Sequence, residues 1–224
     1  MIVAPGRQPS LCQELALLAI EPEHGRLRGA IGYGLAAAAL YDLVLLRRIT
    51  LDGGVVRVSD ERPTGDAVLD EALCSIVNER WTKRTAQWVR ALGRTRDLRE
   101  RMIRSLEADG LVRRLDERPD SVLPAERYSV VPHRLRAYLV ARVRATLLER
   151  LREASERDVA LAVVLASIHM LDRFFARDER ELAYLRISLL IGTSSAGSTL
   201  AAALSEVRVL ALAPFAAPRA ATAR

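Results

Sequence analysis

Arginines crowd one stretch of this chain, and their spacing suits the binding of an anion. The stretch runs from residue 94 to residue 114 and contains Arg94, Arg96, Arg99, Arg101, Arg104, Arg113 and Arg114. At about 100° per residue, its leucine, isoleucine and methionine side chains form one apolar stripe on a helix. Arg99 falls inside the arc of that stripe and Arg96 lies just beyond it, whereas Arg104 points to solvent.

A guanidinium on the apolar side of a helix costs free energy unless it meets an anion. One candidate anion is an internal carboxylate such as Asp66, Asp70 or Glu71. The other is a bound phosphate, which Arg96 and Arg99, one helical turn apart, can grip with bidentate hydrogen bonds. The sequence leaves both interpretations open.

The residues that commonly carry catalysis are scattered. The histidines are far apart in the sequence: His24, His133 and His169. No zinc-protease, serine-hydrolase or Cys–His–Asp pattern is present. We expect His169 to be a core histidine, Asp70-Glu71 to be solvated or ion-paired, and Cys12 and Cys74 to be buried thiols in apolar helices. The sequence therefore predicts no enzyme, no metal site and no cofactor.

The composition agrees with an anionic partner without requiring one. The chain has 34 Lys and Arg against 28 Asp and Glu, a net charge of +6 and an isoelectric point near 10.0. Such a balance favours a polyanion partner. However, Lys83 is the only lysine, which is typical of a GC-rich bacterial genome that raises arginine everywhere. The clustering of the arginines is therefore more informative than their number.

The patterning predicts a mainly helical fold with a central helical bundle, surrounding amphipathic helices and two short β-hairpins. One domain is expected over residues 1–212, followed by a flexible tail at 213–224. Ser10 and Gln13 match a capping box that opens the first helix. The expected helices are 11–20, 29–46, 66–80, 83–92, 96–108, 133–152, 158–171 (capped by Ser155), 178–190 and 198–210. The expected hairpins are 48–58 and 111–115 paired with 127–131.

Residues 187–205 carry no charge and are about as long as a membrane span. Glycine, serine and threonine interrupt their middle, so we expect two helices joined by a loop. The N-terminal residues lack the charged and apolar regions of a signal peptide. The expected location is therefore the cytoplasm.

Several motifs in one order resemble the Golgi phosphoprotein 3 family. They are Gly34-Leu35, Arg48-Ile49, PTGDAVLDEAL at 63–73, AQWV at 86–89 and RDLRERMIRSLEADGLV at 96–112. The family includes phosphatidylinositol-4-phosphate-binding adaptors, and the resemblance extends from residue 11 to about residue 172. It implies a predominantly helical fold that binds membranes peripherally, through a basic headgroup pocket beside an apolar hairpin tip.

The resemblance assigns part of the headgroup pocket to this chain. Two basic residues of the family's R-x-x-RER helix carry over to Arg96 and Arg99. The family's arginine in a Gly-Leu-Arg-Gly-Gly run does not, because Ala36 occupies that position. The family's tryptophan aligns with a shortened segment near residue 27. Arg26 and Arg28 in that segment are candidates to replace the missing charge.

The implied partner is an anionic phospholipid or phosphoinositide surface, together with a client membrane enzyme. Val122-Leu123-Pro124 would be the membrane-inserting tip of the second hairpin. Nucleic acid is not the expected partner, but a helix followed by a wing-like hairpin also suits a winged-helix DNA-binding protein. That alternative requires an exposed recognition helix with Arg94, Arg101 and Arg104. It also requires Arg113 and Arg114 on the wing.

Overall fold

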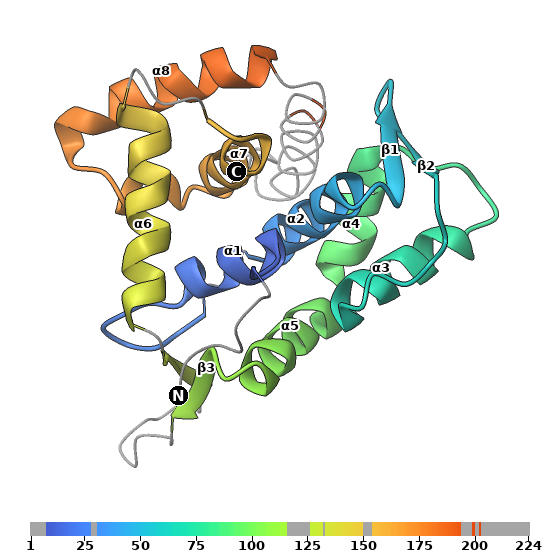
Figure 1. The fold of residues 1–224 in the computed structure, drawn as a ribbon, viewed down its shortest axis with the longest axis horizontal. Coiled ribbons are helices and arrows are strands. Elements are labelled where there is room, and N and C mark those ends of the chain that lie inside the picture. The colour runs from blue at the N-terminus through green and yellow to red at the C-terminus, as the bar shows by residue number, and fades with distance from the viewer. Residues whose placement is uncertain are drawn as a thin grey trace, which may run out of the picture.

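The computed structural model describes residues 8–27, 31–115, 126–131, 133–149, 154–193, 199 and 202 (Figure 1). Within these ranges it contains eight α-helices and two two-stranded antiparallel sheets, which confirms the mainly helical prediction. The helices are α1 (Leu11–Ala19), α2 (Ile31–Leu45), α3 (Ala67–Val77), α4 (Thr85–Arg94), α5 (Arg96–Ala108), α6 (His133–Leu148), α7 (Glu156–Ser167) and α8 (Arg177–Thr193), with a 3-10 turn at Leu171–Arg173. The strands are β1 (Ile49–Asp52), β2 (Val55–Val58), β3 (Val112–Leu115) and β4 (Arg127–Val130).

Helix α2 forms the centre of the bundle. Its alanine- and leucine-rich sequence is apolar on all sides, and its residues from Gly34 to Leu43 are buried. Helices α1, α3, α4, α5 and α7 all pack against it. The crossing with α4 depends on glycine, because a Cβ at Gly93 would lie 2.6 Å from a ring carbon of Tyr33. This arrangement is the central bundle that the sequence predicts.

Local capping signals set several helix ends. Ser10 and Gln13 form both halves of the capping box of α1, as expected from their spacing. Ser155 caps α7 through the backbone N–H of Asp158, and Asp66 caps α3. Helix α5 has the predicted bounds. The ends of α3 and α4 differ from the predicted ends by one to three residues.

The two β-hairpins lie at opposite ends of the molecule (Figure 1). The β1–β2 turn places Gly53 and Gly54 at positive φ, as the Asp-Gly-Gly sequence predicts. In the other hairpin, Val112 pairs with Val130 and Leu115 with Arg127. Both hairpin predictions are confirmed.

Two predictions about buried residues are wrong. Cys74 is exposed, because α3 turns Leu73 and Ile76 rather than Cys74 toward the core. His169 is also exposed, because α7 ends at Ser167 and His169 takes a positive φ of 56° in the turn that follows. Met170 packs in the core beyond that turn. Among the described residues, no helix is long and apolar enough to cross a membrane.

Candidate anion-binding site

Helix α5 presents Arg99 at the edge of the core. Leu98, Met102 and Leu106 on the same helix are buried, and Arg99 is half-buried beside them. Its Nη2 donates a hydrogen bond to the carbonyl oxygen of Leu27 at 3.3 Å. The helical wheel therefore placed Arg99 correctly, and the structure adds its neighbour, the segment that carries Arg26.

That segment folds back on itself and extends the second sheet. The backbone N–H of Glu21 donates to the carbonyl of Arg26, and Arg26 bridges Arg127 of β4 in antiparallel register. Gly25 has a φ of 67°, and a Cβ there would lie 2.6 Å from the carbonyl oxygen of Tyr128. A glycine is needed at this close approach because a side chain would push the segment away from β4.

The internal carboxylates proposed as alternative partners are engaged elsewhere. Asp70 accepts hydrogen bonds from the N–H and the hydroxyl of Thr64. Glu71 pairs with Arg101, and Asp66 caps the first turn of α3. Arg99 pairs with no carboxylate in the part of the chain that the structure describes. The internal ion-pair interpretation is therefore wrong for Arg99.

Arg99 also influences the buried phenol of Tyr128. Burial raises the pKa of Tyr128, and the hydrogen bond and charge of Glu126 raise it further. The positive charges of Arg114 and Arg99 partly oppose this rise and lower the pKa of Tyr128. The guanidinium of Arg99 is thus close enough to the second sheet to act on it electrostatically.

The structure describes only some of the predicted site residues. Arg26 is exposed, and Arg99 contacts the adjacent Leu27. Arg96 is the first residue of α5, but its side chain lies outside the described part, as do Arg28 and the predicted tip Val122-Leu123-Pro124. Ala36 is fully buried inside α2, so any positive charge that replaces the family's arginine must come from another element.

The TGD-x-x-LDE motif has a structural role that the sequence did not show. Thr64 and Asp70 close the turn before α3 through hydrogen bonds of 2.5 and 2.6 Å. Glu71, the residue after Asp70, reaches across to Arg101 on α5. Arg101 is consequently paired and only partly exposed, so it is less available than the winged-helix alternative requires. Arg94, Arg104, Arg113 and Arg114 are exposed.

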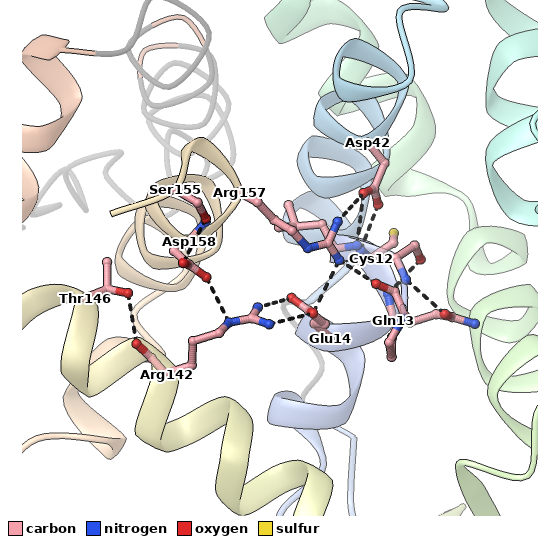
Figure 2. A network of polar contacts seen from close by, with 12 residues as sticks. Cys12, Gln13, Glu14, Asp42, Arg142, Thr146, Ser155, Arg157 and Asp158 are labelled. Atoms are coloured by element: carbon pink, nitrogen blue, oxygen red, sulfur yellow. Dashed lines mark hydrogen bonds and ion pairs between the residues drawn. The ribbon is translucent and has the colours of Figure 1, made fainter. Parts of the chain in front are cut away.

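A second cluster of arginines lies in the core and was missed from the sequence (Figure 2). Arg142 of α6 donates to Glu14 of α1 at 3.0 Å, and its Nε lies 2.8 Å from a carboxylate oxygen of Asp158 on α7. Arg157 of α7 lies 3.3 Å from Glu14 and 3.4 Å from Asp42 of α2. This buried ion network joins four helices. Its only sequence signal is the presence of Glu14 and Asp42 in otherwise apolar helices.

The charges in this network shift one another's pKa values. Burial raises the pKa of Asp42 to about 6, although the N–H groups of Leu11 and Cys12 and the charge of Arg157 act to lower it. Burial lowers the pKa of Arg142, but the hydrogen bond and charges of its acidic partners outweigh burial and leave it above its ordinary value. Paired in this way, these groups hold helices together and are not available to a ligand.

No group of histidine, cysteine or acidic side chains in the described ranges is arranged to hold a metal ion. The family model of Golgi phosphoprotein 3 (GPP34) matches residues 11–209, and the chain belongs to this family. The family consists of non-catalytic, phosphatidylinositol-4-phosphate-binding adaptors that associate peripherally with membranes. None of the curated proteins matches the chain.

Proposed function

We propose that this protein is a non-catalytic peripheral membrane protein that binds an anionic lipid headgroup through Arg96 and Arg99. The headgroup is of the phosphatidylinositol-4-phosphate type, and the protein acts from the cytoplasmic side as an adaptor for a membrane enzyme. Arg26 and Arg28 supply the charge that the family places at the position of Ala36. The family assignment supports the class of function, and the residues of this chain support the site.

One observation carries the proposal. Arg99 is half-buried, and its described partner is the neutral carbonyl oxygen of Leu27 rather than a carboxylate. A guanidinium offers five N–H donors, and a single carbonyl satisfies only a small part of that capacity. A phosphate monoester would supply both the missing acceptors and the missing charge. Arg96, one helical turn earlier on α5, lies at the right spacing to share it.

Two weak interactions would hold the protein on the membrane. Burial of the aliphatic side chains of Val122 and Leu123 contributes about 3 to 5 kcal/mol at best. Each arginine near an anionic surface adds about 1 kcal/mol. Neither contribution gives stable attachment alone, so the protein should bind reversibly and should dissociate at high salt.

Vesicle flotation tests the headgroup site. The full chain is mixed with phosphatidylcholine vesicles that contain either phosphatidylinositol 4-phosphate or phosphatidylserine at equal surface charge. We expect the wild type to prefer the phosphoinositide vesicles and the variant Arg96→Gln/Arg99→Gln to lose that preference. The variant Arg94→Gln/Arg104→Gln removes the same number of charges from exposed positions on α4 and α5. It should keep the preference for phosphoinositide vesicles.

Equal recovery of the wild type and the Arg96→Gln/Arg99→Gln variant with the phosphoinositide vesicles would contradict the proposed headgroup site. The winged-helix alternative makes the opposite prediction for the control variant. It requires Arg94→Gln/Arg104→Gln to weaken salt-dependent binding to duplex DNA, with no binding to vesicles. A denaturation curve for each variant separates loss of binding from loss of folding.

A further inference from the structure

The second hairpin sorts its arginines onto two faces. Val112, Val130 and Tyr128 are buried, so their side of the β3–β4 sheet faces the core. Because side chains alternate along a strand, Arg113 and Arg127 lie on the opposite side. Arg26 bridges Arg127 directly and therefore shares its face. We call this side, with Arg26, Arg113 and Arg127, the outer arginine face.

The three arginines of the outer arginine face lie close together. Residues directly opposite in an antiparallel pair have Cβ atoms about 4.5 to 5.5 Å apart, which applies to Arg26 and Arg127. Arg113 pairs with Ser129 and is the diagonal neighbour of Arg127, at about 7 to 8 Å. The Nε of Arg127 donates to the carbonyl of His24 at 2.9 Å, which holds this side chain over the turn that leads to Arg26.

No acid neutralises this face within the described ranges. None of the three arginines forms an ion pair there. Glu21, the acid nearest to Arg26 along the backbone hydrogen bonds, pairs with Arg173 at 3.2 Å. Like charges placed directly opposite destabilise a sheet. The arrangement is therefore best tolerated where anions lie over it.

The neighbouring arginine on the core side shows the contrast. Arg114 lies opposite Tyr128, and its guanidinium is 3.2 Å from Glu126 and 3.5 Å from Glu107. Adjacent residues of one strand thus have opposite electrostatic surroundings. Arg114 is neutralised within the protein, whereas Arg113 is exposed and the half-buried Arg127 meets only the carbonyl of His24.

We propose that the outer arginine face is a second membrane contact, which binds the phosphates of an anionic bilayer without selecting the headgroup. The proposal rests on the membrane association proposed above. It assigns a different task to an adjoining surface. Arg96 and Arg99 discriminate between headgroups, whereas Arg113 and Arg127 supply general attraction to negative charge. Arg26 belongs to both surfaces. A bilayer is favoured over duplex DNA because Arg101, which a DNA-reading α5 would need, is paired with Glu71.

Vesicle partition of the full chain tests this division. The variant Arg113→Gln/Arg127→Gln is compared with the wild type on phosphatidylcholine vesicles that contain phosphatidylserine only. We expect about thirtyfold weaker partition, since each arginine near an anionic surface contributes about 1 kcal/mol and about 1.4 kcal/mol is a factor of ten. The dependence of partition on salt should also become shallower. Arg113→Lys/Arg127→Lys, which keeps the charges, should restore binding.

Two controls make the outcomes distinct. Arg57→Gln/Arg80→Gln removes two exposed charges near the opposite hairpin and should leave partition unchanged. On phosphoinositide vesicles, the outer-face variant should bind more weakly but keep the preference over phosphatidylserine. If the wild type shows no such preference, the headgroup-site proposal is wrong. The outer-face proposal is then still tested by partition on phosphatidylserine vesicles. The outer-face proposal is overturned if its variant partitions like the Arg57/Arg80 control, or if only duplex DNA binding is lost.

Discussion

The molecule uses arginine in two opposite ways. In the buried ion network, Arg142 and Arg157 lie among the carboxylates of Glu14, Asp42 and Asp158 (Figure 2). Four other arginines, by contrast, have no carboxylate partner in the described part of the chain. They lie on α5, on the second hairpin and on the segment bridged to it: Arg99, Arg113, Arg127 and Arg26. Both groups have the same chemistry and differ only in what surrounds them.

The difference separates the arginines that hold the fold from those that can hold a ligand. A buried arginine with carboxylates on several sides has its hydrogen-bonding capacity and charge satisfied within the protein. A half-buried or exposed arginine that meets only a backbone carbonyl retains donors and charge for an outside anion. The net charge of +6 does not show this, because it counts both kinds together.

Arg142→Met should have the largest effect, and the effect should be on stability. The substitution leaves Glu14, which is 1% exposed, and Asp158 without their shared cation. Removing one partner of a buried ion pair costs about 3 to 5 kcal/mol. Urea denaturation measures the loss. Arg134→Met, at an exposed position of the same helix, should change the free energy of unfolding by less than about 0.5 kcal/mol.

Asp42→Asn should remove a pH dependence of stability. The folded-state pKa of Asp42 is about 6, above its ordinary value of 3.8. The folded protein therefore binds more protons than the unfolded chain between about pH 4 and pH 6, and the free energy of unfolding falls as pH rises through that window. The shifted pKa of Asp42 changes the free energy of unfolding by on the order of 3 kcal/mol across the whole window.

Denaturation at several pH values checks the sign for Asp42. The stability of the wild type minus that of Asp42→Asn should decrease as pH rises from about 4 to about 7. The lowered pKa values of Asp60 and Glu179 act in the opposite direction at lower pH, but both proteins share them. Parallel stability curves would show that Asp42 does not titrate in this window.

Arg101→Gln should have a smaller effect on stability. Arg101 pairs with Glu71 between α5 and α3, and both side chains are about 40% exposed. Partly exposed pairs of this kind contribute about 0.2 to 1 kcal/mol. The variant should therefore be slightly less stable in thermal denaturation and should bind phosphoinositide vesicles like the wild type. If Arg101→Gln loses more binding than the control variant Arg94→Gln/Arg104→Gln does, Arg101 belongs among the ligand-binding arginines.

Arg99→Gln should have a similarly small effect on stability and a clear effect on binding. Its described hydrogen bond to the carbonyl of Leu27 is long, at 3.3 Å, and no buried acid depends on it. We expect a change of less than about 1 kcal/mol in the free energy of unfolding. A large destabilisation by Arg99→Gln would show that Arg99 holds the fold in the way that Arg142 and Arg157 do. The distinction between structural and ligand-binding arginines would then be wrong.

The sequence predicts the features that depend on nearby residues. Ser10 and Gln13 gave the start of α1, the bounds of α5 followed from its apolar stripe, and the wheel placed Arg99 at the edge of the core. The missed features depend on long-range contacts. Arg142 and Glu14 are 128 positions apart, and periodicity cannot show which helices meet.

The errors on single residues have the same origin. His169 belongs to an apolar pattern, but a local turn ends α7 before it and leaves it exposed. The bridge between Arg26 and Arg127 joins segments about a hundred positions apart, so the outer arginine face has no local signal. The carboxylate partners that separate the two groups of arginines likewise come from distant parts of the chain.

One measurement tests the division of the arginines most directly. In a ¹⁵N-labelled full chain, the arginine Nε–Hε signals are followed by NMR while soluble glycerophosphoinositol 4-phosphate is added. Lysine substitutions assign the signals of Arg99 and Arg142. The signal of Arg99 should move in a saturable way, and that of Arg142, held by Glu14 and Asp158, should stay in place. A stationary Arg99 signal, or equal movement of both, would contradict the account.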